Sequence, residues 1–228
     1  MRAGISIVVL SIASALALGA SAAYAADTTT TTRAASSASS TASPLLRKSD
    51  LPKKYTSVAE PASTTSQSPR YPTVDASCVV NPQVPFSGLV PKTSLLSWAT
   101  GSTGVTGGAE TTYVYDDVTT AKALYRNFAD TYEALTRCPT AKQTIPASGS
   151  TPARTVDIGS WKALAIPAVG EEQIGIELTP TASTTNTSRI ALWRDGGTVV
   201  VLNLRDKAQP KAVFNKLVTT AEQRVEQA

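Results

Sequence analysis

Acidic side chains that could do chemistry occur as two adjacent pairs, Asp116-Asp117 and Glu171-Glu172. Two carboxyl groups that flank one bond are the machinery of glycoside hydrolysis, so each pair is a candidate acid pair. Adjacent residues of a strand point to opposite faces, however, so neither pair is expected to converge on one substrate. We expect Asp117 to cap a helix and Glu171-Glu172 to lie in a turn.

Several catalytic and metal-binding arrangements are excluded by composition. The chain has no histidine, so it can build neither a Ser-His-Asp triad nor a Cys-His pair. The usual zinc sites need histidine or more than two cysteines. No Gly-Lys dipeptide, Ser-x-x-Lys pattern or Gly-x-Ser-x-Gly motif occurs in the sequence. The sequence therefore predicts a protein that is not an enzyme and that holds no metal and no cofactor.

The N-terminus has the features of an export signal. Arg2 precedes the apolar stretch Ile5–Leu18, and Ala23-Tyr24-Ala25 supplies a cleavage pattern. Because a membrane span needs about 20 apolar residues, a cleaved signal peptide over residues 1–25 is favoured over an uncleaved anchor. No cysteine lies near the cleavage point, which excludes a lipoprotein. We expect a secreted or extracytoplasmic protein that could associate with the cell envelope. After removal of the signal peptide, no membrane span is expected.

Composition then divides the remaining chain into a tether and one domain. Residues 26–43 are almost wholly Ala, Thr and Ser, which predicts a disordered tether. Residues 44–228 are enough for a single globular domain. The net charge of +4 is spread along the chain, which argues against nucleic-acid binding. A basic cluster is a solvated face or a site for anionic wall polymers. It consists of Arg47, Lys48, Lys53 and Lys54.

Apolar spacing predicts two long helices. The first begins after Asp117 and ends at Cys138-Pro139, with apolar residues at steps of three and four. Its stripe consists of Ala121, Leu124, Tyr125, Phe128, Tyr132 and Leu135. The second begins near Pro210, a residue suited to a first helical turn. Its apolar face consists of Phe214, Leu217, Val218, Ala221 and Val225.

Cys78 and Cys138 are the two cysteines of the chain. Two thiols in an oxidising compartment usually pair, so we expect a disulfide, the alternative being two separate buried thiols. A bridge across so long a loop would stabilise the fold by about 4 kcal/mol in the chain-entropy model.

Alternating apolar residues between the helices predict a β-sheet. Asp195-Gly196-Gly197 separates two strands, and this turn sequence is compatible with two loop lengths. A two-residue Asp-Gly loop would pair Leu192 with Val199. A three-residue loop with a glycine bulge pairs even positions with even positions, and it is favoured because it gathers the apolar residues on one face. That face would carry Ile190, Leu192, Val200, Leu202 and Leu204.

The predicted fold class is therefore α+β: an antiparallel sheet with both main helices packed on one face and one disulfide. The opposite face is then left for recognition. It would carry Glu177, Arg189, Trp193, Asn203 and Arg205, which we predict as ligand-binding residues. The alternative is a solvated face with one aromatic side chain on it.

The order of these pieces resembles a known family. Leu45-Leu46 with Asp50-Leu51-Pro52, Cys78, the strand-then-helix unit from Tyr113 to Cys138, and the hairpin and helix from Arg194 to Val225 follow one another. This order resembles the PknH-like extracellular sensor domains of actinobacterial receptor Ser/Thr kinases. The resemblance implies a mixed sheet-and-helix domain with a cleft for an unidentified ligand. Family members carry two disulfides, whereas this chain can form one, and no functional residue is carried over.

Two functions are consistent with these observations. The first is a secreted, non-catalytic, sensor-like domain that binds a small or lipidic ligand from the envelope or the extracellular space in a cleft. The second is a structural or interaction protein of the cell envelope that binds wall polymers or a protein partner. A deep apolar pocket would favour the first, and a flat charged face would favour the second.

Overall fold

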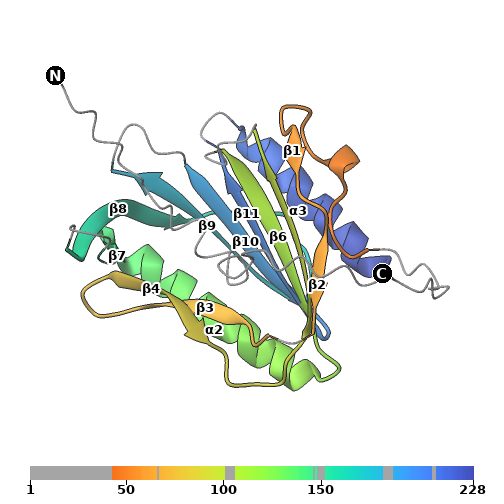
Figure 1. The fold of residues 1–228 in the computed structure, drawn as a ribbon, viewed down its shortest axis with the longest axis horizontal. Helices are drawn as coiled ribbons and strands as arrows, with labels where there is room; N and C mark the ends of the chain where they lie inside the picture. Colours follow the sequence, from red (N-terminus) through yellow and green to blue (C-terminus); the bar gives the residue numbers. More distant parts are fainter. Residues whose placement is uncertain are drawn as a thin grey trace, which may run out of the picture.

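The computed structural model describes residues 43–65, 67–100, 106–145, 147, 152–181, 187–206 and 209–228. The predicted signal peptide lies outside these residues, and so does the predicted tether apart from Ser43. The described residues form one long, strongly bent sheet with two α-helices and a short 3-10 helix (Figure 1).

The strands and helices follow one another along the chain in a fixed order. The elements are η1 (Lys48–Asp50), β1 (Ser57–Val58), β2 (Ala62–Thr64), β3 (Arg70–Val74), β4 (Val79–Pro85), β5 (Lys92–Ala99), β6 (Gly107–Val114), α2 (Val118–Arg137), β7 (Ala141–Ile145), β8 (Arg154–Ala163), β9 (Glu172–Pro180), β10 (Ser188–Asp195), β11 (Thr198–Arg205) and α3 (Lys211–Glu226). Both predicted helix starts are confirmed. The Asp117 carboxylate accepts hydrogen bonds from the backbone N–H groups of Thr119 and Thr120, and Pro210 directly precedes α3.

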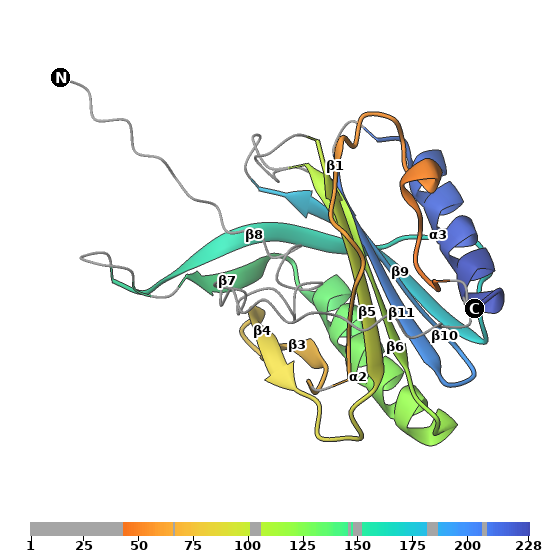
Figure 2. The ribbon, with the colours of Figure 1, turned by 45° about the vertical axis from the view of Figure 1, so that its right-hand side comes forward.

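The sheet has the strand order β1-β5-β6-β11-β10-β9-β8-β7-β4-β3, with β2 also paired to β5. The described strand pairs are antiparallel except for β4 with β7. β8 pairs with β7 in its first half and with β9 in its second half, and the change of partner occurs at Gly159. Gly159 has a φ of 137°, and a Cβ there would lie 2.2 Å from the Thr179 carbonyl oxygen. The sheet bends beyond β9, and both β8 and β3 contact α2 (Figure 2).

The two helices cover opposite faces of the sheet, which corrects the prediction that both pack on one face. Val199 and Val201 of β11 belong to the cluster that contains α2, whereas Val200 and Leu202 belong to the cluster that contains α3. Neighbouring positions of a strand point to opposite faces, so both faces of β11 are buried. The α+β class holds, in a three-layer arrangement. Neither described helix has a stretch apolar and long enough to span a membrane.

The β10–β11 hairpin has a two-residue loop, Gly196-Gly197, because Asp195 pairs directly with Thr198. The predicted glycine bulge is therefore wrong, and so is the register of the Asp-Gly alternative. Leu192 lies opposite Val201 instead. The error has a physical cause: a glycine bulge is favoured only if all the aliphatic residues must lie on one face. With a helix on each face, apolar residues are required at both odd and even positions.

Cys78 and Cys138 form the predicted disulfide, with their Cα atoms 5.8 Å apart. Cys138 ends α2, and Cys78 precedes β4. The Cys78 carbonyl also accepts a hydrogen bond of 2.8 Å from the Lys142 N–H, next to the parallel β4–β7 pair. The disulfide therefore fastens the β3–β4 hairpin to the C-terminal end of α2.

Candidate functional site

The five predicted ligand-binding residues do not share a face. The observed pairings place Glu177, Arg189 and Trp193 on the face that α3 covers, because Arg189 lies opposite Glu177 and Leu204. Asn203 and Arg205 occupy odd positions of β11 and lie on the α2 face with Val199 and Val201. The prediction of one common recognition surface is corrected by the hairpin register.

Trp193 belongs to the α3 core. Its side chain is fully buried, and its indole Nε1 donates a hydrogen bond to the Glu222 carboxylate of α3. The other Glu222 oxygen accepts a bond of 2.7 Å from the Gly170 N–H. Burial raises the pKa of Glu222 above its ordinary value, and the two hydrogen bonds oppose that rise. Trp193 therefore joins α3 to the sheet and presents no surface to a ligand.

Arg189 and Glu177 form an ion pair across β9 and β10, with Nε and Oε2 2.5 Å apart. A second nitrogen of Arg189, Nη1, donates a bond of 2.7 Å to the Gln209 carbonyl just before α3. Two of the three nitrogens of this guanidinium, Nε and Nη1, thus bond within the protein. We interpret the pair as a connection between the sheet and the start of α3.

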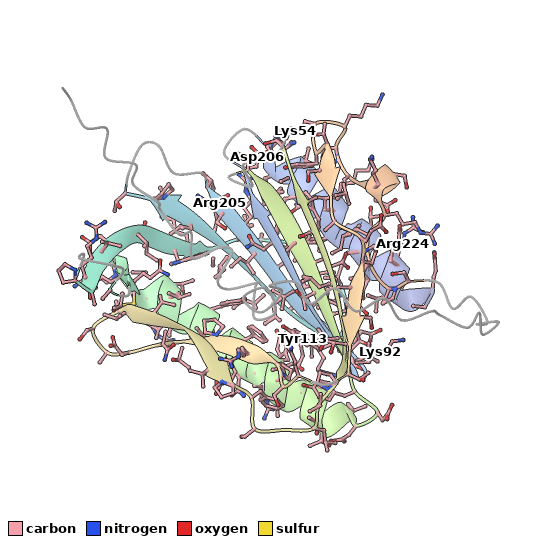
Figure 3. The ribbon with its side chains drawn as sticks, viewed as in Figure 1. Lys54, Lys92, Tyr113, Arg205, Asp206 and Arg224 are labelled. Atoms are coloured by element: carbon pink, nitrogen blue, oxygen red, sulfur yellow. A yellow bond between two sulfur atoms is a disulfide. The ribbon has the colours of Figure 1, made fainter. Side chains whose placement is uncertain are left out.

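Arg205 differs from the other predicted charged residues. Its side chain is partly buried at the end of β11 (Figure 3), and burial lowers the pKa of its guanidinium. Among the residues that the structure describes, none forms a hydrogen bond or an ion pair with this guanidinium. A partly buried cation is normally paired, because burial removes part of its hydration. Arg205 is therefore a cation on the α2 face to which the described residues offer no partner.

A single row of residues crosses the sheet at the level of Arg205. Pairing across β6, β11, β10, β9 and β8 places five residues side by side on the α2 face. We call Gly107, Arg205, Ser188, Leu178 and Trp161 the Arg205 row. The row combines one cation, one hydroxyl and two large apolar side chains.

Asn203 and Ser188 add polar groups next to Arg205. Both side chains are buried, and the Ser188 hydroxyl and the Asn203 side-chain oxygen lie 3.2 Å apart in a hydrogen bond. Asn203 occupies the α2 face two positions before Arg205 along β11. Ser188 was not predicted as a site residue, and no motif around it in the sequence would have indicated this role.

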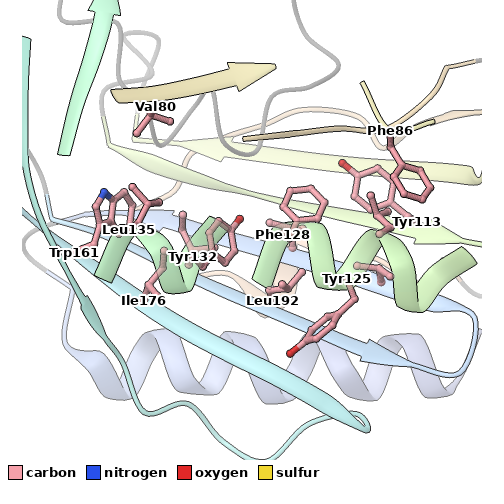
Figure 4. Close-up of a cluster of buried hydrophobic side chains, with 14 of the residues drawn as sticks. Val80, Phe86, Tyr113, Tyr125, Phe128, Tyr132, Leu135, Trp161, Ile176 and Leu192 are labelled. Atoms are coloured by element: carbon pink, nitrogen blue, oxygen red, sulfur yellow. The ribbon is translucent and has the colours of Figure 1, made fainter. Parts of the chain in front are cut away.

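Two buried donors without acceptors lie at the other end of the Arg205 row. The Trp161 indole Nε1 and the Tyr132 hydroxyl make no hydrogen bond within the described part of the chain, although both side chains are buried. Figure 4 shows Trp161, Leu135 and Tyr132 grouped at the C-terminal end of α2. Burial raises the pKa of the Tyr132 hydroxyl, so it stays protonated and able to donate. Buried donors usually have partners, so both are candidates for contact with a bound molecule.

Members of both candidate acid pairs make contacts within the protein. Glu171 and Glu172 both bond to the Arg194 guanidinium, the latter at 2.7 Å, so this acid pair is an ion-pair cluster. Arg194 lowers the pKa of Glu171. Asp117 caps α2, as expected. Within the described ranges, no group of three or more potential metal ligands comes together.

Comparison with known proteins shows a likeness to a solved structure. No protein-family model matches the chain, and no curated protein matches it. The crystal structure of the extracellular domain of PknH from Mycobacterium tuberculosis superposes with a TM-score of 0.53 and 14% sequence identity. The match covers 80% of this chain and 91% of that domain. The fold resembles the PknH extracellular domain. The predicted PknH-like architecture is therefore confirmed at the level of the fold.

Proposed function

We propose that this chain is an extracytoplasmic, sensor-like domain without catalytic activity, which binds an anionic ligand at the Arg205 row. The observation that carries the proposal is the partly buried Arg205 guanidinium, for which the described residues supply no partner. Of the five residues predicted from the sequence, Arg205 and Asn203 stay in the proposed site. Glu177, Arg189 and Trp193 are assigned to structural roles.

The chemistry of Arg205 defines the ligand class. A guanidinium presents several N–H donors in a rigid plane, which matches the two oxygens of a carboxylate, phosphate or sulfonate group. Such an anion would replace the hydration that Arg205 loses through burial. Leu178 and Trp161 continue the same row, so the ligand is expected to carry an apolar part beside its anionic group. An acceptor atom on that part could accept from Trp161 Nε1.

Two further observations support an extracytoplasmic binding role. The Cys78–Cys138 disulfide fits an oxidising compartment. The fold resembles a domain that lies outside the cell in PknH. Absence of histidine from the whole sequence removes the most common general base, which favours binding over catalysis.

The proposal can be tested with anilinonaphthalene sulfonate, a fluorescent dye that combines one sulfonate with aromatic rings. We expect Arg205→Gln to weaken dye binding about tenfold or more, because it removes charge-assisted hydrogen bonds. The matched control is Arg154→Gln, which removes an exposed arginine from β8 and should leave binding unchanged. Arg205→Lys should keep part of the affinity, since it keeps the charge but not the planar donors.

Equal dye affinity in the wild type and in Arg205→Gln would contradict the proposed site, provided that both proteins melt at similar temperatures. If the protein then sediments with purified cell wall whether or not Arg205 is present, a structural role in the envelope would be the better description.

A further inference from the structure

The segment from Leu45 to Tyr55, which we call the N-terminal strap, lies across the α3 face of the sheet beside α3 (Figures 1 and 2). Its apolar side chains are buried in the same cluster as Leu96, Trp98 and the α3 residues. The buried strap residues are Leu45, Leu46, Leu51 and Tyr55. In the sequence, the strap connects the domain to everything upstream of it.

Polar contacts fasten the strap at three places. Asp50 bonds to Arg224 of α3 at 3.0 and 3.2 Å. The Tyr55 hydroxyl donates a bond of 2.9 Å to Asp206, which also pairs with Lys54. The first of these contacts lies in the middle of the strap, and the second lies at its C-terminal end. The third contact lies near its N-terminal end.

This third contact joins the Leu46 N–H to the Glu110 carboxyl, with N and Oε2 2.7 Å apart. Glu110 lies in the middle of β6 with an exposed fraction of 0%. Its other oxygen, Oε1, makes no hydrogen bond to any described residue. The Thr112 hydroxyl and the Trp98 indole N–H lie on the same face and are also without partners among the described residues.

Among the residues that the structure describes, no positively charged side chain bonds to Glu110. Across the sheet it faces Leu96 of β5 and Leu202 of β11. The strap presents Asp50, whose negative charge opposes ionisation of Glu110, and α3 presents Arg224, which is already bonded to Asp50. An ionised carboxylate at this position would therefore be buried with a single backbone N–H as its partner.

We propose that Glu110 is a pH-dependent fastening for the N-terminal strap: the protonated carboxyl keeps the strap docked, and ionisation loosens it. Docking removes the carboxyl from water, and this burial is the main reason that the pKa of Glu110 rises to about 8. The Leu46 N–H lowers the pKa, and the charge on Asp50 raises it.

The sign of the pH dependence follows from proton linkage. When the strap is released, Glu110 returns toward the ordinary pKa of a glutamate, 4.5. The docked state therefore holds its proton more tightly than the released state. Docking is most favourable below the ordinary pKa and weakens as the pH rises from there to about 8. Acidification thus tightens the strap, and mildly alkaline conditions loosen it. This inference is independent of the ligand site, which lies on the other face of the sheet.

The test is hydrogen–deuterium exchange of the strap as a function of pH, with rates corrected for intrinsic amide exchange. Between about pH 6 and pH 9, protection of the Leu46 amide should fall at least about tenfold in the wild type. Glu110→Gln cannot ionise, so protection of the same amide should not change over this range. Glu133→Gln is the matched control, because Glu133 is exposed on α2 and this variant should behave as the wild type does.

A wild-type Leu46 amide whose protection is constant over this pH range would overturn the proposal, even if Glu110→Gln does not fold. The same fall in protection in a folded Glu110→Gln protein would overturn it as well, because the fall would then have another origin.

Discussion

The indole Nε1 of Trp193 donates a hydrogen bond to the Glu222 carboxylate across the interface between β10 and α3. This contact assigns to packing a tryptophan that the sequence suggested for recognition. It also belongs to a structural difference between the two faces of the sheet. The α3 face is closed by Trp193, α3 and the N-terminal strap, whereas the α2 face carries Arg205 without a described partner.

Replacing Trp193 should destabilise the fold. We expect Trp193→Ala to lower the free energy of unfolding by about 3–5 kcal/mol, as truncation of a buried aromatic side chain does. Trp193→Phe should cost less, because it keeps a ring in the core and loses mainly the bond to Glu222. Urea denaturation followed by circular dichroism measures both changes. A loss below about 1 kcal/mol for Trp193→Ala would show that this side chain is not part of the core.

Removing the disulfide should loosen the end of α2 and the β3–β4 hairpin. We expect the double variant Cys78→Ser, Cys138→Ser to lose about 4 kcal/mol of stability, since the bridge closes a long loop of the unfolded chain. Thiol titration of the denatured, unreduced protein should find no free thiol. Two free thiols in exported protein would contradict the expectation.

Two truncated proteins distinguish the contribution of the tether to stability from that of the N-terminal strap. A protein that begins at Pro44 should unfold at nearly the same temperature as the mature chain, because residues 26–43 lack apolar residues for packing. A protein that begins at Thr56 also lacks Leu45, Leu46, Leu51 and Tyr55, which are buried. Each contributes about 1.5–3 kcal/mol, so this protein should fold poorly or not at all. Calorimetric melting of the two proteins tests the contrast, and equal stability would show that the strap does not pack as described.

Local features could be predicted from the sequence, and long-range ones, apart from the disulfide, could not. The α2 stripe and the Asp117 cap depend on spacing within a few residues, so they are read directly from the chain. The face of a strand residue depends on what covers the sheet. Val199, Val200 and Val201 are all buried, and their sequence does not show that two different helices cover them. For this reason the sequence grouped Arg205 with Glu177, Arg189 and Trp193, which lie on the other face of the sheet.

The other features that the sequence does not predict depend on contacts between distant segments. The sequence shows Leu45 and Leu46 as a short apolar segment, but not that it docks on β6. Glu110 lies 64 positions away from Leu46, and no local pattern connects the two. Likewise, the Arg205 row forms only when five strands align, so its members are scattered along the chain.

The three tryptophans provide the most direct measurement of the proposed function. Each has one indole N–H, and these resonate separately in a nitrogen–proton correlation spectrum of the labelled protein. Trp161 lies in the Arg205 row, whereas Trp98 and Trp193 lie in the α3-face cluster. On addition of anilinonaphthalene sulfonate, the Trp161 signal should shift in the wild type and should not shift at the same dye concentration in Arg205→Gln. Shifts confined to Trp98 and Trp193, or a Trp161 shift that is equal in both proteins, would contradict an anionic ligand site at Arg205.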